Sequence, residues 1–290
     1  MSGMALGLVL AAAFLHATWN YLTKKSEVKL VFIWWFLLIS VVLYFPLFLY
    51  FWTRTTITSV GWICIMATSI LHALYFGFLG QAYEEGDLSI VYPLARGMGP
   101  FLVPFFAVGL IKEQLSLPGI IGIGLIILGI YILHLTSFSK TTFLQPFLRL
   151  KDRSSRWALG TGVTIALYSL VDKIGVGHVY PPVYIYLMFV GAFILLSPYI
   201  LMKKRLLLFE EWQKNRHAIL AVGFLTLFTY LLVLFAMQMS KVSYIVALRE
   251  TGILFSALYG AFWLREGRVR QKIVGAILIF CGVFSIGFSK

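Results

Sequence analysis

Two arginines and one glutamate lie inside long apolar stretches of the sequence, where a charged side chain is costly. Arg96 falls within the apolar run 88–110, and the adjacent Arg249 and Glu250 fall at a similar depth in the run 242–264. A charge at the centre of a membrane-spanning helix costs about 2.5–3.5 kcal/mol on insertion scales, so each of these groups needs a partner or a purpose.

These three charges predict a site for a small molecule that carries an anionic group. A guanidinium recognises a carboxylate or phosphonate through a fork of two hydrogen bonds, and this is the role that we expect for Arg96 or Arg249. Glu250 is expected to take a cationic group or a coupling proton. The residues leave one alternative open, because Glu250 could instead pair with an arginine and lock two parts of the protein together.

A polar stripe runs along the first apolar stretch of the chain. His16, Trp19, Asn20 and Thr23 have the spacing i, i+3, i+4 and i+7, which places them on one face of a helix. A helix surrounded by lipid does not need such a stripe. We therefore expect it to line a cavity, with His16 as a proton carrier or hydrogen-bond partner; a polar seam between helices is the alternative.

Aromatic side chains supply the remaining candidates for the cavity wall. Five tyrosines lie deep in apolar runs: Tyr75, Tyr92, Tyr168, Tyr230 and Tyr244. Of these, Tyr75, Tyr92 and Tyr168, together with His72, are predicted to contact substrate, since an aromatic lining can bind an organic cation or a ring. For any single tyrosine, packing in the core is the ordinary role. Asp172 and Lys173 lie near the end of an apolar run, and we expect them to form only an interfacial pair.

The elements that position these residues must be membrane-spanning helices. Of the 290 residues, 60% are hydrophobic and 12% are charged, and the mean hydropathy is +0.91. Soluble domains have about twice that share of charge, so soluble, disordered and disulfide-rich secreted proteins are excluded. Ten apolar runs follow one another: roughly 4–22, 29–52, 59–83, 88–110, 117–136, 157–175, 181–202, 217–239, 242–264 and 269–288.

The chain also contains a repeat. Sliding the sequence by 153 positions places Arg96 on Arg249. The same offset aligns Gly7 with Gly160, Gly99 with Gly252, Gly122 with Gly275, Gly129 with Gly282 and Lys112-Glu113 with Arg265-Glu266. We predict a five-helix repeat over 1–136, a basic linker over 137–156 and a second repeat over 157–290. An odd number of spans inverts the second repeat, as in many secondary transporters.

Basic residues indicate how the protein lies in the membrane. Lys and Arg number 24 against 11 Asp and Glu, and most of them fall in the gaps on one side of the predicted bundle. The positive-inside rule makes this side cytoplasmic, including the gaps 137–156 and 203–216, and places both termini outside. We expect a multi-pass protein of the inner or plasma membrane. The same distribution explains the charge of +13 without nucleic acid as a partner.

The sequence resembles the drug/metabolite transporter superfamily, specifically its ten-span members with two EamA-type repeats. Short segments carry the resemblance: His16-Ala17-Thr18-Trp19-Asn20, Tyr92-Pro93-Leu94-Ala95-Arg96-Gly97, the polar span ends Ile111-Lys112-Glu113 and Leu264-Arg265-Glu266, and glycine-spaced fifth spans. The resemblance covers nearly the whole chain and implies a carrier. It implies little about cargo, because the superfamily moves chemically diverse metabolites and drugs.

Other functional classes are less well supported by the residues. The chain has no H-E-x-x-H, G-x-S-x-G or P-loop motif, and Cys64 and Cys281 lack metal-site spacing, so we expect no enzyme, metal, cofactor or direct use of ATP. We predict a secondary transporter for a small polar metabolite, zwitterionic or of the amine or phosphonate type, with proton coupling left open. A multidrug exporter of organic cations or aromatic toxicants, a channel and a scaffold are the alternatives. The partners are then the substrate and lipid, in a monomer or at most a weak dimer.

Overall fold

A computed structural model describes most of the chain. It covers residues 1–24, 26–85, 88–135, 150–255 and 269–289, together with 137, 139, 143 and 144. Within helices, the side chains of Lys24, Tyr83, 88–90, Tyr92, Pro93, His134, Val269 and Arg270 lie outside this description.

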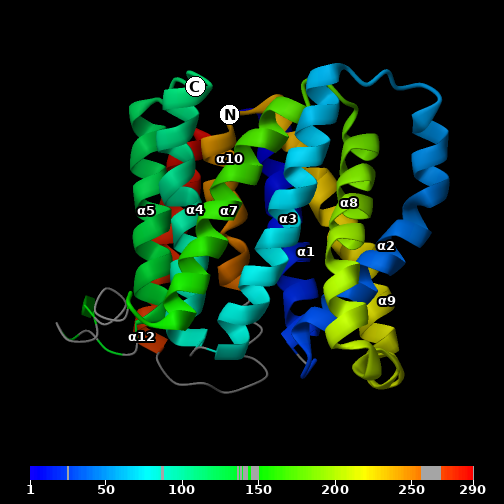
Figure 1. The fold of residues 1–290 in the computed structure, drawn as a ribbon. Helices are drawn as coiled ribbons and strands as arrows, with labels where there is room; N and C mark the ends of the chain where they lie inside the picture. Colours follow the sequence, from blue (N-terminus) through cyan, green and yellow to red (C-terminus); the bar gives the residue numbers. More distant parts are fainter. Residues whose placement is uncertain are drawn as a thin grey trace.

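The described residues form ten α-helices, which confirms the predicted all-α polytopic fold (Figure 1). The helices are α1 (Gly3–Lys24), α2 (Lys29–Trp52), α3 (Ser59–Glu85), α4 (Leu88–Leu110), α5 (Leu117–His134), α7 (Arg153–Gly175), α8 (Pro181–Lys203), α9 (Arg205–Met239), α10 (Val242–Arg249) and α12 (Val269–Gly287). Both termini lie at one end of the bundle, here called the terminal end, and α5 stops and α7 begins at the opposite end (Figure 1).

Not every helix has the composition of a simple membrane span. Among the described residues, α1, α2, α3, α8 and α9 are long and apolar enough to cross a membrane, and α4, α5 and α12 contain shorter apolar stretches. Helix α7 is more polar because it packs between α3 and α4, where its buried Thr161, Thr164 and Asp172 do not face lipid. A helix enclosed by protein needs less hydrophobic surface than one in contact with lipid.

Helices α5 and α12 cross at two pairs of glycines that show the inverted relationship between the repeats. A Cβ atom at Gly122 would lie 2.7 Å from the carbonyl oxygen of Gly282, and one at Gly129 would lie 2.8 Å from that of Gly275. The earlier glycine of α5, Gly122, therefore meets the later glycine of α12, Gly282, and the reverse holds for the other pair. The two helices are antiparallel. Because the 153-residue offset relates Gly122 to Gly275 and Gly129 to Gly282, each contact is the symmetry counterpart of the other.

Two predicted boundaries are wrong. The run 242–264 is not one continuous helix, because α10 ends at Arg249, the chain turns at Glu250 and Thr251, and helical geometry resumes at 252–255. Hydrogen bonds of the i+3 type close this turn, such as that from the Thr251 amide to the Leu248 carbonyl at 3.0 Å. The segment 203–216, predicted as a loop, is helical from Arg205 onward and forms the first turns of α9.

Candidate functional site

Seven of the predicted site residues converge on one buried cavity in the middle of the bundle, here called the central cavity. Its volume is about 50 Å³. The predicted residues that line it are His16, Trp19, His72, Tyr75, Arg96, Tyr168 and Arg249, from five different helices. The structure thus brings together side chains that lie more than 200 positions apart in the sequence.

Arg96, Arg249 and Glu250 form a buried charge cluster beside this cavity. Nη1 of Arg96 lies 3.6 Å from Oε1 of Glu250, and Nε of Arg249 lies 3.9 Å from the same oxygen. The side chains of the arginines are 4% exposed and that of Glu250 is 2% exposed, so water screens these charges weakly. Two cations share one carboxylate, and the three side chains together carry a net positive charge.

His16 is bound to this cluster through its ring. The Nη2 group of Arg96 donates a hydrogen bond to Nε2 of His16. A guanidinium can only donate, so Nε2 must carry a lone pair and His16 is neutral in this arrangement. The ring of Trp19 meets the His16 ring edge-on at 4.6 Å. Asn20 does not line the cavity, because its amide donates to the His16 carbonyl of its own helix at 2.8 Å.

Tyr168 connects the charge cluster to a group of stacked rings. Its hydroxyl accepts a hydrogen bond of 3.2 Å from Nη2 of Arg249. The His72 ring stacks on the Tyr168 ring with 4.1 Å between centroids, and Tyr75 meets Tyr168 edge-on at 5.8 Å. These aromatic side chains therefore line the central cavity, and their contact with substrate stays a prediction. The prediction for Tyr92 falls on a side chain outside the described part of the chain.

Asp172 does not form the interfacial pair with Lys173 that the sequence suggested. The Asp172 side chain is fully buried and accepts hydrogen bonds from three hydroxyl groups: those of Thr68, Tyr184 and Tyr230. Lys173 points the other way and donates to the carbonyl groups of Met237 and Ser240 at the end of α9. Adjacent residues of a helix point about 100° apart, so a sequence neighbour need not be a spatial partner.

Sequence reasoning also missed part of the cavity wall on α9. Thr226, Thr229 and Tyr230 line the central cavity, and of these only Tyr230 was recognised as a deep aromatic residue. Their spacing of i, i+3 and i+4 is the same signal that identified the stripe on α1. Among the described residues, the buried hydroxyl of Thr229 has no hydrogen-bond partner.

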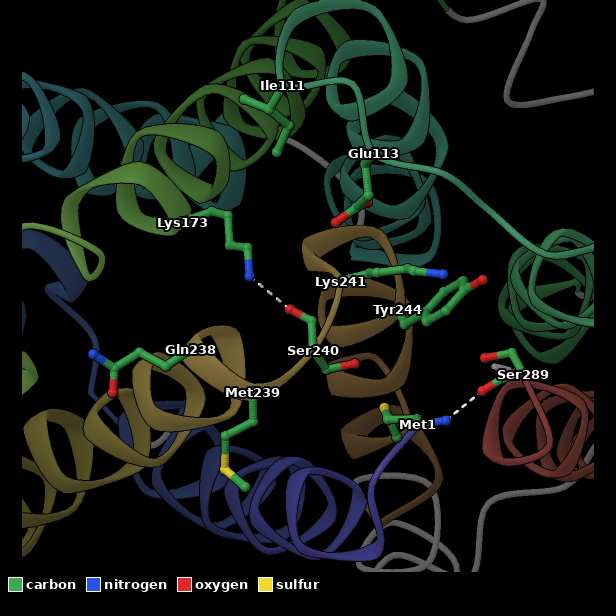
Figure 2. A pocket seen from close by; sticks show the side chains of 10 residues that line it. All are labelled: Met1, Ile111, Glu113, Lys173, Gln238, Met239, Ser240, Lys241, Tyr244 and Ser289. Atoms are coloured by element: carbon green, nitrogen blue, oxygen red, sulfur yellow. Dashed lines mark hydrogen bonds between the residues drawn. The ribbon is translucent and has the colours of Figure 1, made fainter.

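A larger cavity of about 460 Å³ opens at the terminal end of the bundle and is here called the vestibule (Figure 2). Its wall contains Lys173 at the end of α7, and Lys241 and Tyr244 at the start of α10. Glu113 also lines it and accepts hydrogen bonds from the first amides of α10, including that of Val242 at 2.7 Å. A carboxylate at a helix N-terminus stabilises the exposed amides and the helix dipole.

Comparison of the sequence with known protein families identifies the family of this chain. The sequence pattern of the EamA-like transporter family matches residues 3–135 and again residues 154–288. The chain belongs to the EamA-like transporter family. This EamA-like protein is therefore a multi-pass membrane transporter of the drug/metabolite transporter superfamily, a group of carriers and not of enzymes.

A solved structure agrees with this assignment at the level of fold. The EamA-like transporter is similar to a protein described only as "Crystal structure of protein", with a TM-score of 0.68 and 15% identity over 97% of this chain and 94% of the other. An identity this low shows a shared fold and nothing about substrate. None of the curated proteins matches the chain.

Proposed function

We propose that this EamA-like transporter carries a small polar metabolite with an anionic group, of the zwitterionic or aminophosphonate type, by alternating access between its two repeats. The charge cluster is the observation that carries the proposal. Arg96 and Arg249 both lie within 3.9 Å of the single carboxylate of Glu250, and all three are buried. An anionic group beside the two guanidinium groups would balance the remaining positive charge.

The same residues suggest how a zwitterion would be oriented. Its anionic group would bridge Arg96 and Arg249, and its ammonium group would approach Glu250 or the face of Tyr168. Thr229, whose hydroxyl has no partner among the described residues, would supply one further hydrogen bond. This arrangement gives each charged end of the ligand a counterpart of opposite sign.

The two cavities support an alternating-access cycle. A cavity of about 50 Å³ has room for only a few water molecules, since a single buried water needs at least about 10–15 Å³ of such space. A metabolite can therefore occupy the central cavity only after neighbouring helices move apart. The vestibule of about 460 Å³ is large enough for such a molecule. Lys173 and Lys241 outnumber the single acid Glu113 in its wall, and this excess of positive charge would attract an anion.

Ligand-induced stabilisation of the purified protein in detergent tests the proposed cargo class. The probes are 2-aminoethylphosphonate, methylphosphonate and choline, each at two pH values. A ligand at about one hundred times its Kd stabilises the native state by about 2.7 kcal/mol. We expect the phosphonates to raise Tm in a dose-dependent way and Arg96→Ala to abolish the shift, whereas Arg54→Ala, which changes an exposed arginine outside both cavities, should retain it.

The aromatic lining favours one second candidate, an exporter of organic cations or aromatic toxicants. Trp19, Tyr75, Phe76 and Tyr168 all face the central cavity, and Glu250 could balance a single positive charge. In the same assay this alternative predicts stabilisation by choline and none by the phosphonates. A choline shift that survives Arg96→Ala and disappears in Glu250→Gln would replace the anion proposal.

The membrane orientation is part of the proposal. We place the protein in the inner or plasma membrane. The basic segments 137–156 and 203–216 then face the cytoplasm, and both termini lie outside. Alkaline phosphatase fused to either terminus is then expected to be active in a bacterial host. Activity of a fusion after residue 150 and inactivity of the terminal fusions would reverse the orientation. A monomer or weak dimer stays our expectation for the oligomeric state.

A further inference from the structure

Asp172 is a buried acid, and in the described part of the chain its hydrogen bonds all come from hydroxyl groups. Oδ1 accepts hydrogen bonds from Thr68 at 2.6 Å and from Tyr184 at 2.8 Å, and Oδ2 accepts one from Tyr230. These donors lie on α3, α8 and α9, whereas Asp172 lies on α7. The carboxylate therefore joins four helices from both repeats. An ionised carboxylate is an acceptor only, so three donors match its charged form.

The charges around Asp172 do not neutralise it directly. Within the described part of the chain, no Lys or Arg nitrogen lies within ion-pair distance of its carboxylate. The titratable groups that interact electrostatically with Asp172 include Cys64 and His72 on α3, Tyr184 on α8 and Tyr230 on α9. Tyr168 and Lys173 lie on its own helix α7, and the buried arginines Arg96 and Arg249 lie on α4 and α10. Of the two arginines, Arg249 reaches Tyr168, and Arg96 reaches His16 and Glu250.

A short hydrogen-bonded chain connects this carboxylate to the central cavity. The Thr68 hydroxyl donates to Asp172, and Nδ1 of His72 lies 3.0 Å from the same hydroxyl oxygen and 3.0 Å from the Thr68 carbonyl. Because the only Thr68 hydroxyl proton points to Asp172, Nδ1 must be the donor to Thr68. Nε2 of His72 then carries the lone pair, and His72 lines the central cavity.

We propose that Asp172 is the residue that binds the coupling proton, and that His72 and Thr68 deliver it from the central cavity. A proton from the cavity binds to Nε2 of His72. The Nδ1 proton of His72 passes to the Thr68 oxygen, and the Thr68 hydroxyl proton passes to Oδ1 of Asp172. The net result is one neutral aspartic acid and a neutral His72 in its other tautomer, so no charge is left on the relay. This inference rests on the proposed carrier function and adds its energy source.

Proton binding at Asp172 would also loosen contacts between the helices. A protonated Oδ1 is a weaker acceptor for Tyr184 and must itself donate to Thr68, which reverses the hydrogen bond between α3 and α7. His72 Nδ1 would then face the Thr68 carbonyl with a lone pair in place of a proton, and this unfavourable contact favours release or rearrangement. Glu250 is another buried acid that could bind the proton. Its protonation would leave Arg96 and Arg249 without their shared counter-charge, which makes it the less favourable site.

The location of Asp172 agrees with a role in transfer between the two cavities. It lies four residues beyond Tyr168 on α7, which is about 6 Å along the helix toward the terminal end. The next residue, Lys173, already belongs to the vestibule wall. Asp172 itself is buried and does not line the vestibule, so the relay runs from the central cavity toward the level of the vestibule without opening into it.

Infrared difference spectroscopy of the protein in liposomes identifies the acid without any substrate. On lowering the pH, exposed carboxyl groups protonate in every variant, but a buried carboxylic acid gives a separate carbonyl stretch at higher frequency. We expect this high-frequency band in the wild type and in Glu250→Gln and its absence in Asp172→Asn. Loss of the band in Glu250→Gln and its retention in Asp172→Asn would assign the proton to Glu250 and overturn the proposal.

Variants of Thr68 test the relay with Asp172 in place, which also covers the case that Asp172→Asn does not fold. Thr68→Ser keeps a hydroxyl group and is the matched control for Thr68→Val. After a pH jump, we expect the band to appear about a hundredfold more slowly in Thr68→Val, the lower range of what a positioned proton-transfer group contributes, and at nearly the wild-type rate in Thr68→Ser. Equal rates in the two variants would overturn the relay.

Uptake of 2-aminoethylphosphonate into proteoliposomes separates this inference from the proposed function. Asp172→Asn is expected to abolish accumulation driven by a pH gradient while exchange at equal pH continues. If Asp172→Asn shows exchange and also accumulates the phosphonate as well as the wild type under a pH gradient, Asp172 does not couple transport to protons, and the proposed cargo is unaffected. Absence of any uptake by the wild type would count against the proposed cargo, and the infrared result would still decide where the proton binds.

Discussion

The glycine crossing between α5 and α12 offers a sharp test of the inverted-repeat packing. Replacing Gly122 by alanine would place a Cβ atom 2.7 Å from the carbonyl oxygen of Gly282, whereas ordinary contacts of this kind are 3.4–4 Å. The oxygen belongs to the backbone of α12 and cannot turn aside. The two helices must therefore move apart, and the contacts along the crossing weaken with them.

The size of this effect can be isolated with a control on the same helix. Overpacking a tight contact costs about 1–3 kcal/mol. Alanine also favours a helix over glycine by about 0.5–1 kcal/mol, which offsets part of that cost. A Cβ atom at Gly124 would have nothing within 4 Å, so Gly124→Ala keeps the gain in helix propensity without the clash. Gly122→Ala should consequently be about 1–3 kcal/mol less stable than Gly124→Ala.

Reversible unfolding in mixed micelles, followed by circular dichroism, measures this difference. Gly282→Ala should match Gly122→Ala, because its Cβ atom would lie 2.7 Å from the Gly122 oxygen. The double variant should cost less than the sum, since helices that one substitution has already separated accommodate the second. Equal stabilities of Gly122→Ala and Gly124→Ala would refute the close crossing and the symmetry argument built on it.

Three further predictions concern charged side chains. Glu250→Gln should destabilise the protein by about 3–5 kcal/mol, because it leaves two buried guanidinium groups without their carboxylate, and chemical unfolding measures this loss. Glu113→Gln should increase hydrogen exchange of the Val242 amide about fivefold or more, as expected when a helix cap worth about 1 kcal/mol is lost. Lys214 lowers the pKa of Glu27 by donating a hydrogen bond of 2.8 Å to its carboxylate. The stability that this pair adds to the folded state is therefore fully present above the pKa of Glu27 in the unfolded chain, and it is lost as the pH falls through the lowered pKa of the folded state. The difference in Tm between wild type and Lys214→Met should accordingly disappear at acidic pH.

The sequence predicted the features of this transporter that depend on periodicity. A single offset identified the repeat, and the charges of Arg96 and Arg249 marked the depth at which the helices would meet. The turn at Glu250 was missed, because a hydrophobic run looks the same whether or not its helix is interrupted. Just after the turn the backbone passes close to α1, which no local pattern reveals: a Cβ atom at Gly252 would lie 2.8 Å from the Ala13 carbonyl oxygen.

The role of Asp172 could not be predicted for a related reason. Its sequence neighbour Lys173 offered an obvious partner, and the three hydroxyl groups that bind it come from distant helices. Only Tyr184 is near in sequence, at 12 residues, whereas Thr68 is 104 residues away. Hydrogen-bond partners of a buried group depend on tertiary packing, and one sequence contains little information about it.

The duplicated scaffold carries a site that is not symmetric, and this asymmetry gives the central cavity its charge. The offset relates Arg96 to Arg249, but it relates Glu250 to Gly97, so two arginines share a single acid. An acid at both positions would cancel the charge of both arginines and remove the attraction for an anion. The relay is one-sided as well, because the counterparts of Asp172 and His72 are Trp19 and Leu225, which cannot bind or pass on a proton. In the mechanism that we propose, two similar halves alternate around one substrate site while the proton binds to only one of them.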